Sequence, residues 1–260
     1  MNFDNTDDIQ NIKYRHRGIK EILKSLLETP IGIHQIFVYP NIEMLREIYF
    51  HYIKKLLDNN NEIIIFLPYY ETAESVKKVL SSFSIEYNNN IEQNKYKDKK
   101  DTTVIEDINR YINNGSLVII DSEKAFSNVH ELETKTKTNG QNDKDNIITQ
   151  ADSSNTNSNN NFLSLLRMSM SQINKLRKEG ITIIADYGFI YNNNNNNNNN
   201  NKNDKFEDLL ELEKSIPYFF DNIKIRQICL YNQKDFFHKF TKQQKKEILD
   251  LHSRSIMMMD

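Results

Sequence analysis

Histidine, cysteine and acidic side chains are the groups in this sequence that could bind a metal ion or carry out acid–base and nucleophilic chemistry. The six histidines show no HExxH pattern and no other compact pair of ligands. Cys229 is the single cysteine, so the chain cannot form an internal disulfide or a metal cluster built on several cysteines. It lies between Ile228 and Leu230, which favours a small buried strand residue over a nucleophile. We therefore predict no metal site, no cofactor and no catalytic residue.

Two aspartates, Asp121 and Asp186, each follow a run of apolar residues, in the patterns LVIID and ITIIAD. An aspartate in this position holds Mg²⁺ in many phosphate-hydrolysing enzymes. The other interpretation is a helix cap or a polar strand end, which needs no metal. We favour the second interpretation, because the phosphate-binding loop that should accompany such an aspartate is missing.

The missing loop is expected where the first strand turns into its helix, at residues 39–43 (YPNIE). A phosphate loop needs glycines whose backbone amides face the phosphates, followed by a lysine and a serine or threonine. Residues 39–43 contain no glycine and no lysine, and Glu43 places a negative charge where an anion would approach. The sequence therefore argues against ATP hydrolysis by a Walker-type site.

Apolar segments of strand length alternate with segments of helical periodicity along the chain. The predicted strands are 33–39, 63–67, 117–120, 181–185 and 225–231, with the SIMMM segment at 255–259 as a further edge strand. The predicted helices are 7–28, 42–58, 71–83, 103–113, 161–179, 205–220 and 234–251. This alternation predicts an α/β fold with a mostly parallel central sheet and helices on both faces. We expect residues 1–30 to form an N-terminal helical extension and residues 31–260 to form a single domain.

Two polar tracts interrupt the alternation. Residues 128–160 are rich in Asn, Ser, Thr, Lys and Asp, and residues 192–204 begin with a run of ten asparagines. Neither tract has enough apolar side chains to offset the entropy of ordering its backbone. We predict that both are disordered insertions in surface loops of the domain.

The overall charge and hydropathy exclude several classes of partner. Lysine and arginine number 34 against 36 aspartate and glutamate, a net charge of −2, so no basic field attracts nucleic acid or an anionic membrane. The longest apolar runs have the length of a strand and cannot cross a bilayer. The polar, acidic start MNFDNTDD does not resemble a secretory signal. We expect a cytoplasmic protein that binds neither nucleic acid nor membrane.

Aromatic and hydrogen-bonding side chains follow the predicted strands, at the carboxyl edge where open α/β sheets bind their ligands. They are Tyr39, Asn41, Tyr69, Glu71 and Tyr231. Such side chains suit a small, partly apolar ligand held by stacking and a few hydrogen bonds. His34 begins a strand that is otherwise apolar, and it is either a hydrogen-bonded structural residue or a ligand contact.

Seven short stretches together carry a family resemblance. They are 34–45 (HQIFVYPNIEML), 61–65 (NEIII), 114–119 (NGSLVI), 178–181 (KEGI), 210–213 (LELE), 228–232 (ICLYN) and 248–252 (ILDLH). With them the chain resembles the MEDS domain, the methanogen/methylotroph DcmR sensory domain, which is a degenerate relative of the KaiC and RecA ATPases. The sequence departs from the family at Asn61, where the family has glycine, and at Ser253, where it has proline.

The resemblance implies a three-layer RecA/KaiC-like fold and a non-catalytic sensory or regulatory function. A domain of this kind binds a small molecule and signals to a protein partner. Carried over by position, the resemblance implies a ligand site at His34, Tyr39, Glu213, Cys229, Tyr231 and His252.

Two other functions stay open. A pseudo-ATPase could assemble with itself, as a homo-oligomer, or with RecA-like relatives and bind no ligand. An ATPase with an unorthodox loop could still bind nucleotide. The polar strand ends favour the sensory interpretation.

Overall fold

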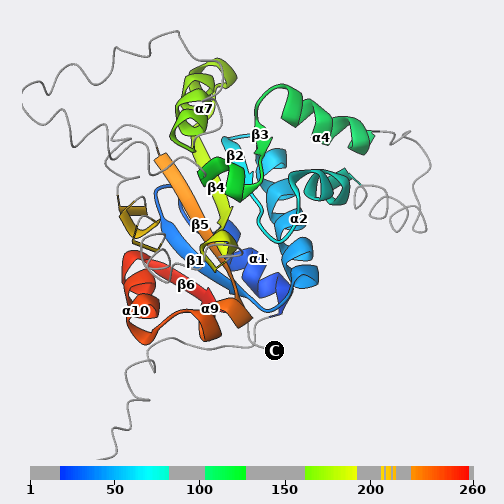
Figure 1. The fold of residues 1–260 in the computed structure, drawn as a ribbon. Helices are drawn as coiled ribbons and strands as arrows, with labels where there is room; N and C mark the ends of the chain where they lie inside the picture. Colours follow the sequence, from blue (N-terminus) through cyan, green and yellow to red (C-terminus); the bar gives the residue numbers. More distant parts are fainter. Residues whose placement is uncertain are drawn as a thin grey trace, which may run out of the picture.

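The structure is a computed structural model, and it describes residues 18–81, 103–126, 162–191 and 224–257, together with residues 206–207, 209–211 and 213–214. We refer to the last group as the 206–214 segment. A single sheet of six strands, in the order β3-β2-β4-β5-β1-β6, forms the centre of the fold (Figure 1). The strands are β1 (His34–Tyr39), β2 (Glu62–Leu67), β3 (Leu117–Ile119), β4 (Gly180–Asp186), β5 (Lys224–Asn232) and β6 (Arg254–Met257).

Every pair of neighbouring strands in this sheet is parallel. Every residue of β2 and β4 is buried, which explains why their sequences are mostly apolar and do not alternate with polar residues. The predicted α/β fold with a mostly parallel sheet is therefore confirmed, as is the edge strand in the SIMMM segment. Each bound of β1 to β5 differs from the predicted one by at most one residue.

One face of the sheet is covered by α1 (Ile19–Leu27), α2 (Ile42–Asn59), a helix at residues 73–81, and α4 (Thr103–Asn113). Alternate side chains of the strands point to this face, so Phe37, Ile64 and Phe66 share a core with α2. Ile22 and Leu26 of α1 are buried in the same core. The described part of the predicted N-terminal extension, which includes α1, thus packs against the sheet as part of the domain.

The opposite face is covered by α5 (Ser122–Phe126), α7 (Phe162–Leu176), the 206–214 segment, α9 (Gln233–Lys239) and α10 (Lys242–Leu251). A short 3₁₀ turn, η2 (Gly188–Tyr191), follows β4. The second core lies between these elements and the other set of strand side chains. Helices therefore pack on both faces of the sheet, as predicted.

The prediction of a single helix at 234–251 is wrong, because residues 240 and 241 are not helical and separate α9 from α10. Phe240 adopts an extended conformation and is buried, and Thr241 begins α10 as its N-cap. Thr241 and Gln244 form a reciprocal capping box, which satisfies two backbone amides that would otherwise lack partners. The spacing Thr241-x-x-Gln244 was the signal in the sequence for this helix start.

A short helix was also missing from the prediction. Ser122–Phe126 forms α5 soon after β3, and the predicted elements included no helix there. The two predicted insertions and residues 7–17 of the helix predicted at 7–28 lie outside the described residues. Within the described residues, no helix combines the length and the apolar character that a bilayer crossing requires.

Candidate functional site

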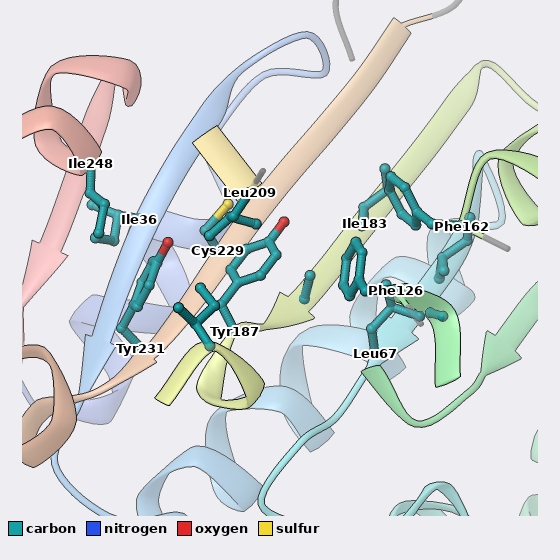
Figure 2. Close-up of a cluster of buried hydrophobic side chains, with 14 of the residues drawn as sticks. Ile36, Leu67, Phe126, Phe162, Ile183, Tyr187, Leu209, Cys229, Tyr231 and Ile248 are labelled. Atoms are coloured by element: carbon teal, nitrogen blue, oxygen red, sulfur yellow. The ribbon is translucent and has the colours of Figure 1, made fainter. Parts of the chain in front are cut away.

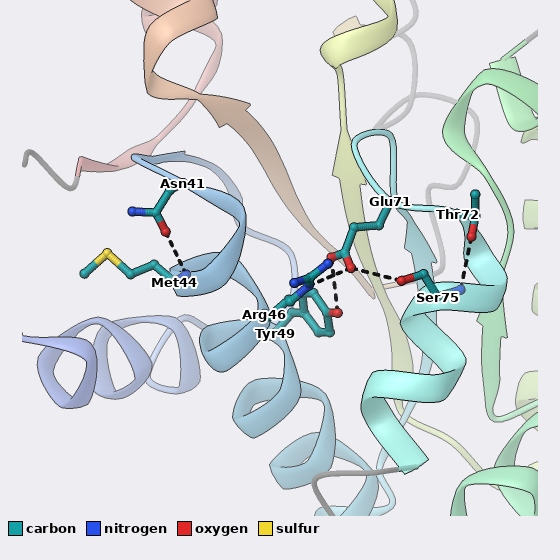
Figure 3. Close-up of polar contacts among 7 residues, drawn as sticks. All are labelled: Asn41, Met44, Arg46, Tyr49, Glu71, Thr72 and Ser75. Carbon is teal, nitrogen blue, oxygen red and sulfur yellow. Dashed lines mark hydrogen bonds and ion pairs between the residues drawn. The ribbon is translucent and has the colours of Figure 1, made fainter.

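Two of the residues predicted at the carboxyl edge of the sheet hold helices in place. The Asn41 side chain accepts a hydrogen bond from Met44 N at 3.0 Å and caps α2. Glu71 accepts hydrogen bonds from Arg46 Nε at 2.8 Å and from the Tyr49 hydroxyl at 3.3 Å (Figure 3). Glu71 is therefore a buried residue that anchors α2. Its carboxylate oxygens already accept hydrogen bonds from the side chains of Arg46 and Tyr49.

The two strand-end aspartates make the contacts expected of structural residues. Asp121 accepts a hydrogen bond from the backbone amide of Ala73 at 2.6 Å, at the start of the helix at 73–81. Asp186 accepts one from the Tyr39 hydroxyl at 2.8 Å and one from Gly188 N at 3.0 Å. The Tyr39 hydroxyl thus reaches from the end of β1 to the end of β4, so both of these groups are paired within the fold.

A pocket of about 430 Å³ opens at the same edge of the sheet and is lined by Tyr69, Tyr70, Glu123, Gly188 and Lys239. The rings of Tyr69 and Tyr70 lie edge-to-face with centroids 4.9 Å apart. A Cβ atom at position 188 would lie 2.2 Å from the Tyr69 ring, so only glycine permits this approach. Of the residues predicted at the carboxyl edge, Tyr69 lines this pocket.

Four of the residues implied by the family resemblance meet in the interior of the domain. One ligand-type atom from each of His34, Glu213, Cys229 and His252 lies within 4.8 Å of the other three. His34 Nε2 is 3.0 Å from Cys229 Sγ, and Cys229 Sγ is 3.3 Å from Glu213 Oε1. The His34 and His252 rings have centroids 4.0 Å apart. We call these four residues the buried cluster.

The sheet register and the start of β6 bring the buried cluster together. β1 and β5 are parallel neighbours, with His34 opposite Gln227 and Ile36 opposite Cys229. His34 and Cys229 therefore point to the same face of the sheet, the face that the 206–214 segment and α10 cover. The backbone amide of Ser253 donates to His34 O at 3.0 Å, and this bond fixes the neighbouring His252 beside the start of β1.

Two atoms of the buried cluster have no hydrogen-bond partner among the described residues. They are Glu213 Oε2 and His252 Nε2. Glu213 is 2% exposed and His252 is 8% exposed, so bulk water does not compensate for the missing partners. The other ring nitrogen of His252, Nδ1, is 2.5 Å from the carbonyl oxygen of Ile248. A carbonyl can only accept, so Nδ1 carries the proton and Nε2 has a free lone pair.

Burial keeps all four groups of the buried cluster uncharged near neutral pH. Burial, together with the nearby His252, lowers the pKa of His34 to about 2, and burial lowers the pKa of His252 to about 4. Burial raises the pKa of Glu213 to about 8. Burial and the nearby Glu213 raise the pKa of Cys229 well above its ordinary value. The buried cluster is thus uncharged. Its histidines offer lone pairs, and Glu213 and Cys229 carry protons that can dissociate when a ligand binds.

Tyr231, the last of the residues implied by the resemblance, lies in the apolar core beside the buried cluster. Figure 2 shows it on β5 two residues after Cys229, near Ile36 and Ile248. Its ring centroid is 5.7 Å from that of Tyr187 and 5.7 Å from that of Phe236. Tyr231 therefore forms part of an aromatic wall.

No family model, no curated protein and no solved structure matches this chain. The resemblance to the MEDS domain therefore stays a prediction. Of its six residues, His34, Glu213, Cys229 and His252 converge on one place, whereas the Tyr39 hydroxyl bonds Asp186 instead. Motif spacing could not reveal the convergence, because each of the four residues comes from a different segment of the chain.

Proposed function

We propose that this chain is a non-catalytic regulatory domain of the RecA-like type, which senses a ligand at the buried cluster and signals to a protein partner. The observation that carries the proposal is the pair of unpartnered buried atoms, Glu213 Oε2 and His252 Nε2. A buried polar atom without a partner costs about 1–3 kcal/mol. A ligand that pairs with both atoms removes that cost, so the site favours an occupied state.

The elements around the buried cluster suggest how occupancy changes the rest of the domain. His34 and Cys229 belong to the sheet, whereas Glu213 and His252 belong to the 206–214 segment and the end of α10. A ligand held by all four residues favours the arrangement in which both helical elements lie closest to the sheet. Because a ligand shifts a conformational equilibrium only through its different affinity for the two states, this closing movement is the signal that a partner can detect.

The carboxyl edge of the sheet supports a function without nucleotide hydrolysis. Asp186 is paired with Tyr39, and Asn41 uses its side chain to cap α2. The turn at residues 39–43 has neither the glycines nor the lysine that hold a triphosphate. The parallel sheet with helices on both faces supports the RecA-like part of the proposal.

Native mass spectrometry of the protein purified from the cells that produce it tests the sensory function. We expect a retained species of defined mass, bound one to one, on the wild-type chain. The His252→Ala variant should lose this species, because it removes one of the four side chains of the buried cluster. The matched control His238→Ala changes an exposed histidine on α9 and should retain the species. Equal retention by all three proteins, or none by any, contradicts the proposal.

Thermal denaturation with ATP and Mg²⁺ separates this function from the two alternatives. We expect no change in melting temperature, since the edge of the sheet offers no phosphate cradle. Stabilisation by roughly 2.7 kcal/mol at a hundredfold excess over Kd would instead identify a nucleotide-binding protein. Concentration-dependent assembly, measured by light scattering on protein that retains no ligand, would identify an assembly module.

A further inference from the structure

We infer that His34, Glu213, Cys229 and His252 are the four ligands of one divalent transition-metal ion, for which Zn²⁺ is the best match. This inference rests on the proposed function, because it names the class of ligand that the buried cluster senses. The four ligand atoms lie within 4.8 Å of one another. Ligands around tetrahedral Zn²⁺ are about 3.3–3.7 Å apart, given metal–ligand bonds of about 2.0–2.3 Å. A closing movement of about an ångström therefore completes the coordination.

The identity of the ligand atoms selects the class of ion. Two imidazole nitrogens, one sulfur and one carboxylate oxygen form a donor set that suits Zn²⁺ and its neighbours in the first transition row. Mg²⁺ and Ca²⁺ prefer sites built wholly from oxygen ligands, so this set disfavours them. The small separations between the four atoms leave room for an ion but not for an organic molecule.

The two unpartnered atoms are the independent observation that points to an ion. Glu213 Oε2 and His252 Nε2 are buried and have no hydrogen-bond partner in the described part of the chain. The bond between His252 Nδ1 and the Ile248 carbonyl holds the ring and leaves the Nε2 lone pair free to bind a metal ion. Metal-binding histidines are oriented by this type of contact, in which the other ring nitrogen donates to a carbonyl or carboxylate.

Charge balance also suits a buried divalent ion. On binding, Cys229 becomes a thiolate and Glu213 a carboxylate, and each releases its proton to solvent, while His34 and His252 bind as neutral imidazoles. The two negative charges match the charge of the ion, so the occupied site is neutral overall. A neutral site avoids the large cost of an unbalanced charge in the protein interior. Four protein ligands leave no open position for a substrate, which fits a regulatory ion rather than a catalytic one.

Direct titration of the full chain, stripped of metal with EDTA, tests the site with Zn²⁺ alone as the probe. We expect isothermal titration calorimetry to show one Zn²⁺ per chain. The variants Cys229→Ser and His252→Gln should bind at least about 100-fold more weakly, because changes even outside the ligand shell cost 10–100-fold. The control His238→Gln, on the exposed face of α9, should bind as tightly as wild type. Absence of binding by wild type, or equal binding by Cys229→Ser, overturns the inference.

Cobalt gives a second readout that does not depend on the variants folding. Co²⁺ added to the stripped wild-type chain should produce the strong visible absorption of a four-coordinate ion and a thiolate-to-cobalt charge-transfer band. The charge-transfer band requires the Cys229 sulfur, since the chain has no other cysteine. Weak absorption typical of six-coordinate Co²⁺, without the charge-transfer band, overturns the inference even where calorimetry detects some binding.

Hydrogen exchange separates failure of the metal site from failure of the sensory function. With Zn²⁺ bound, amides of α10 and the 206–214 segment should exchange more slowly. If Zn²⁺ binds without changing exchange in these elements, the result supports the metal site and contradicts the sensory function. If native mass spectrometry detects an organic ligand that depends on His252 and no Zn²⁺ binds, the sensory function stands and the metal site falls.

Discussion

Replacement of Arg226 by methionine is expected to lower the free energy of unfolding by about 3–5 kcal/mol, the loss typical of a buried ion pair with one partner removed. Arg226 and Glu62 are both buried, and Arg226 Nη2 lies 2.6 Å from Glu62 Oε1. Arg226 Nη1 also donates to the Tyr52 hydroxyl at 3.0 Å, and the Thr182 hydroxyl donates to Glu62. The methionine leaves the Glu62 carboxylate buried without its cation. Urea denaturation at neutral pH measures the change.

The exposed pair Lys246–Asp250 is the matched control for this prediction. Its two atoms lie 2.9 Å apart, yet both side chains are more than 60% exposed. Lys246→Met should change the unfolding free energy by less than about 1 kcal/mol, because solvent screens an exposed pair. The double variant Arg226→Met, Glu62→Gln should recover part of the lost stability. A loss below about 1 kcal/mol for Arg226→Met would contradict the prediction, because it would show that Glu62 does not depend on Arg226 for its stability in the fold.

The Asp186→Asn variant is expected to gain stability over the wild type as the pH rises. Burial raises the pKa of Asp186 from 3.8 to about 7, against the lowering effect of its hydrogen bonds from Tyr39 and Gly188. The folded chain therefore holds this proton more tightly than the unfolded chain does. Its contribution to stability is fully present below about pH 4 and is lost as the pH rises to about 7.

The asparagine side chain does not titrate, so the variant does not lose stability as this group ionises. It can also keep both hydrogen bonds of Asp186. Its oxygen can accept from Gly188 N, and its amide can donate to the Tyr39 hydroxyl, which both donates and accepts. Between pH 5 and pH 8 the difference in unfolding free energy between variant and wild type should grow by on the order of 3 kcal/mol, since one pKa unit corresponds to about 1.4 kcal/mol. Urea denaturation at several pH values measures that difference, in which the other titrating groups cancel.

The Asp121→Asn variant is the control, because its stability relative to wild type should change with pH in the opposite direction. Hydrogen bonding by the Ala73 amide and the charge of Lys124 lower the pKa of Asp121, and they outweigh its partial burial. The folded chain therefore binds this proton less tightly than the unfolded chain does, so Asp121 stabilises the fold above its unfolded pKa. The Asp121→Asn variant should lose stability relative to wild type as the pH rises. If Asp186→Asn behaved in the same way, the Asp186 carboxylate would be ionised and well solvated in the fold.

Local patterns in the sequence were sufficient to predict the fold class. The run Ile63–Leu67 and the turn at Gly180 each mark a buried strand, and alternation with helices predicts a parallel sheet. The break at Phe240 was missed, because no glycine or proline separates α9 from α10 in the sequence. The Thr241-x-x-Gln244 spacing was the available signal in the sequence, and the hydrogen bonds of the capping box show that a new helix begins there.

The candidate site depends on contacts that no local pattern contains. His34 and Cys229 come together through the pairing of β1 with β5, and His252 joins them because β6 pairs with the other edge of β1. A single-sequence pattern carries no information on which strands become neighbours. The family resemblance named these residues by position, but it did not predict that four of them share one small volume.

The place of β1 in the sheet has a consequence for the kinetics of folding. β1 is the first strand in the described part of the chain, but its neighbours are β5 and β6. The contact between His34 and Cys229 spans 195 residues, and the one between Ser253 and His34 spans 219. Closure of loops of this length must precede the pairing of β1, so we expect slow folding with a late rate-limiting step. During synthesis on the ribosome, β1 emerges well before β5 and β6, and it remains an unpaired, aggregation-prone strand until they have followed it.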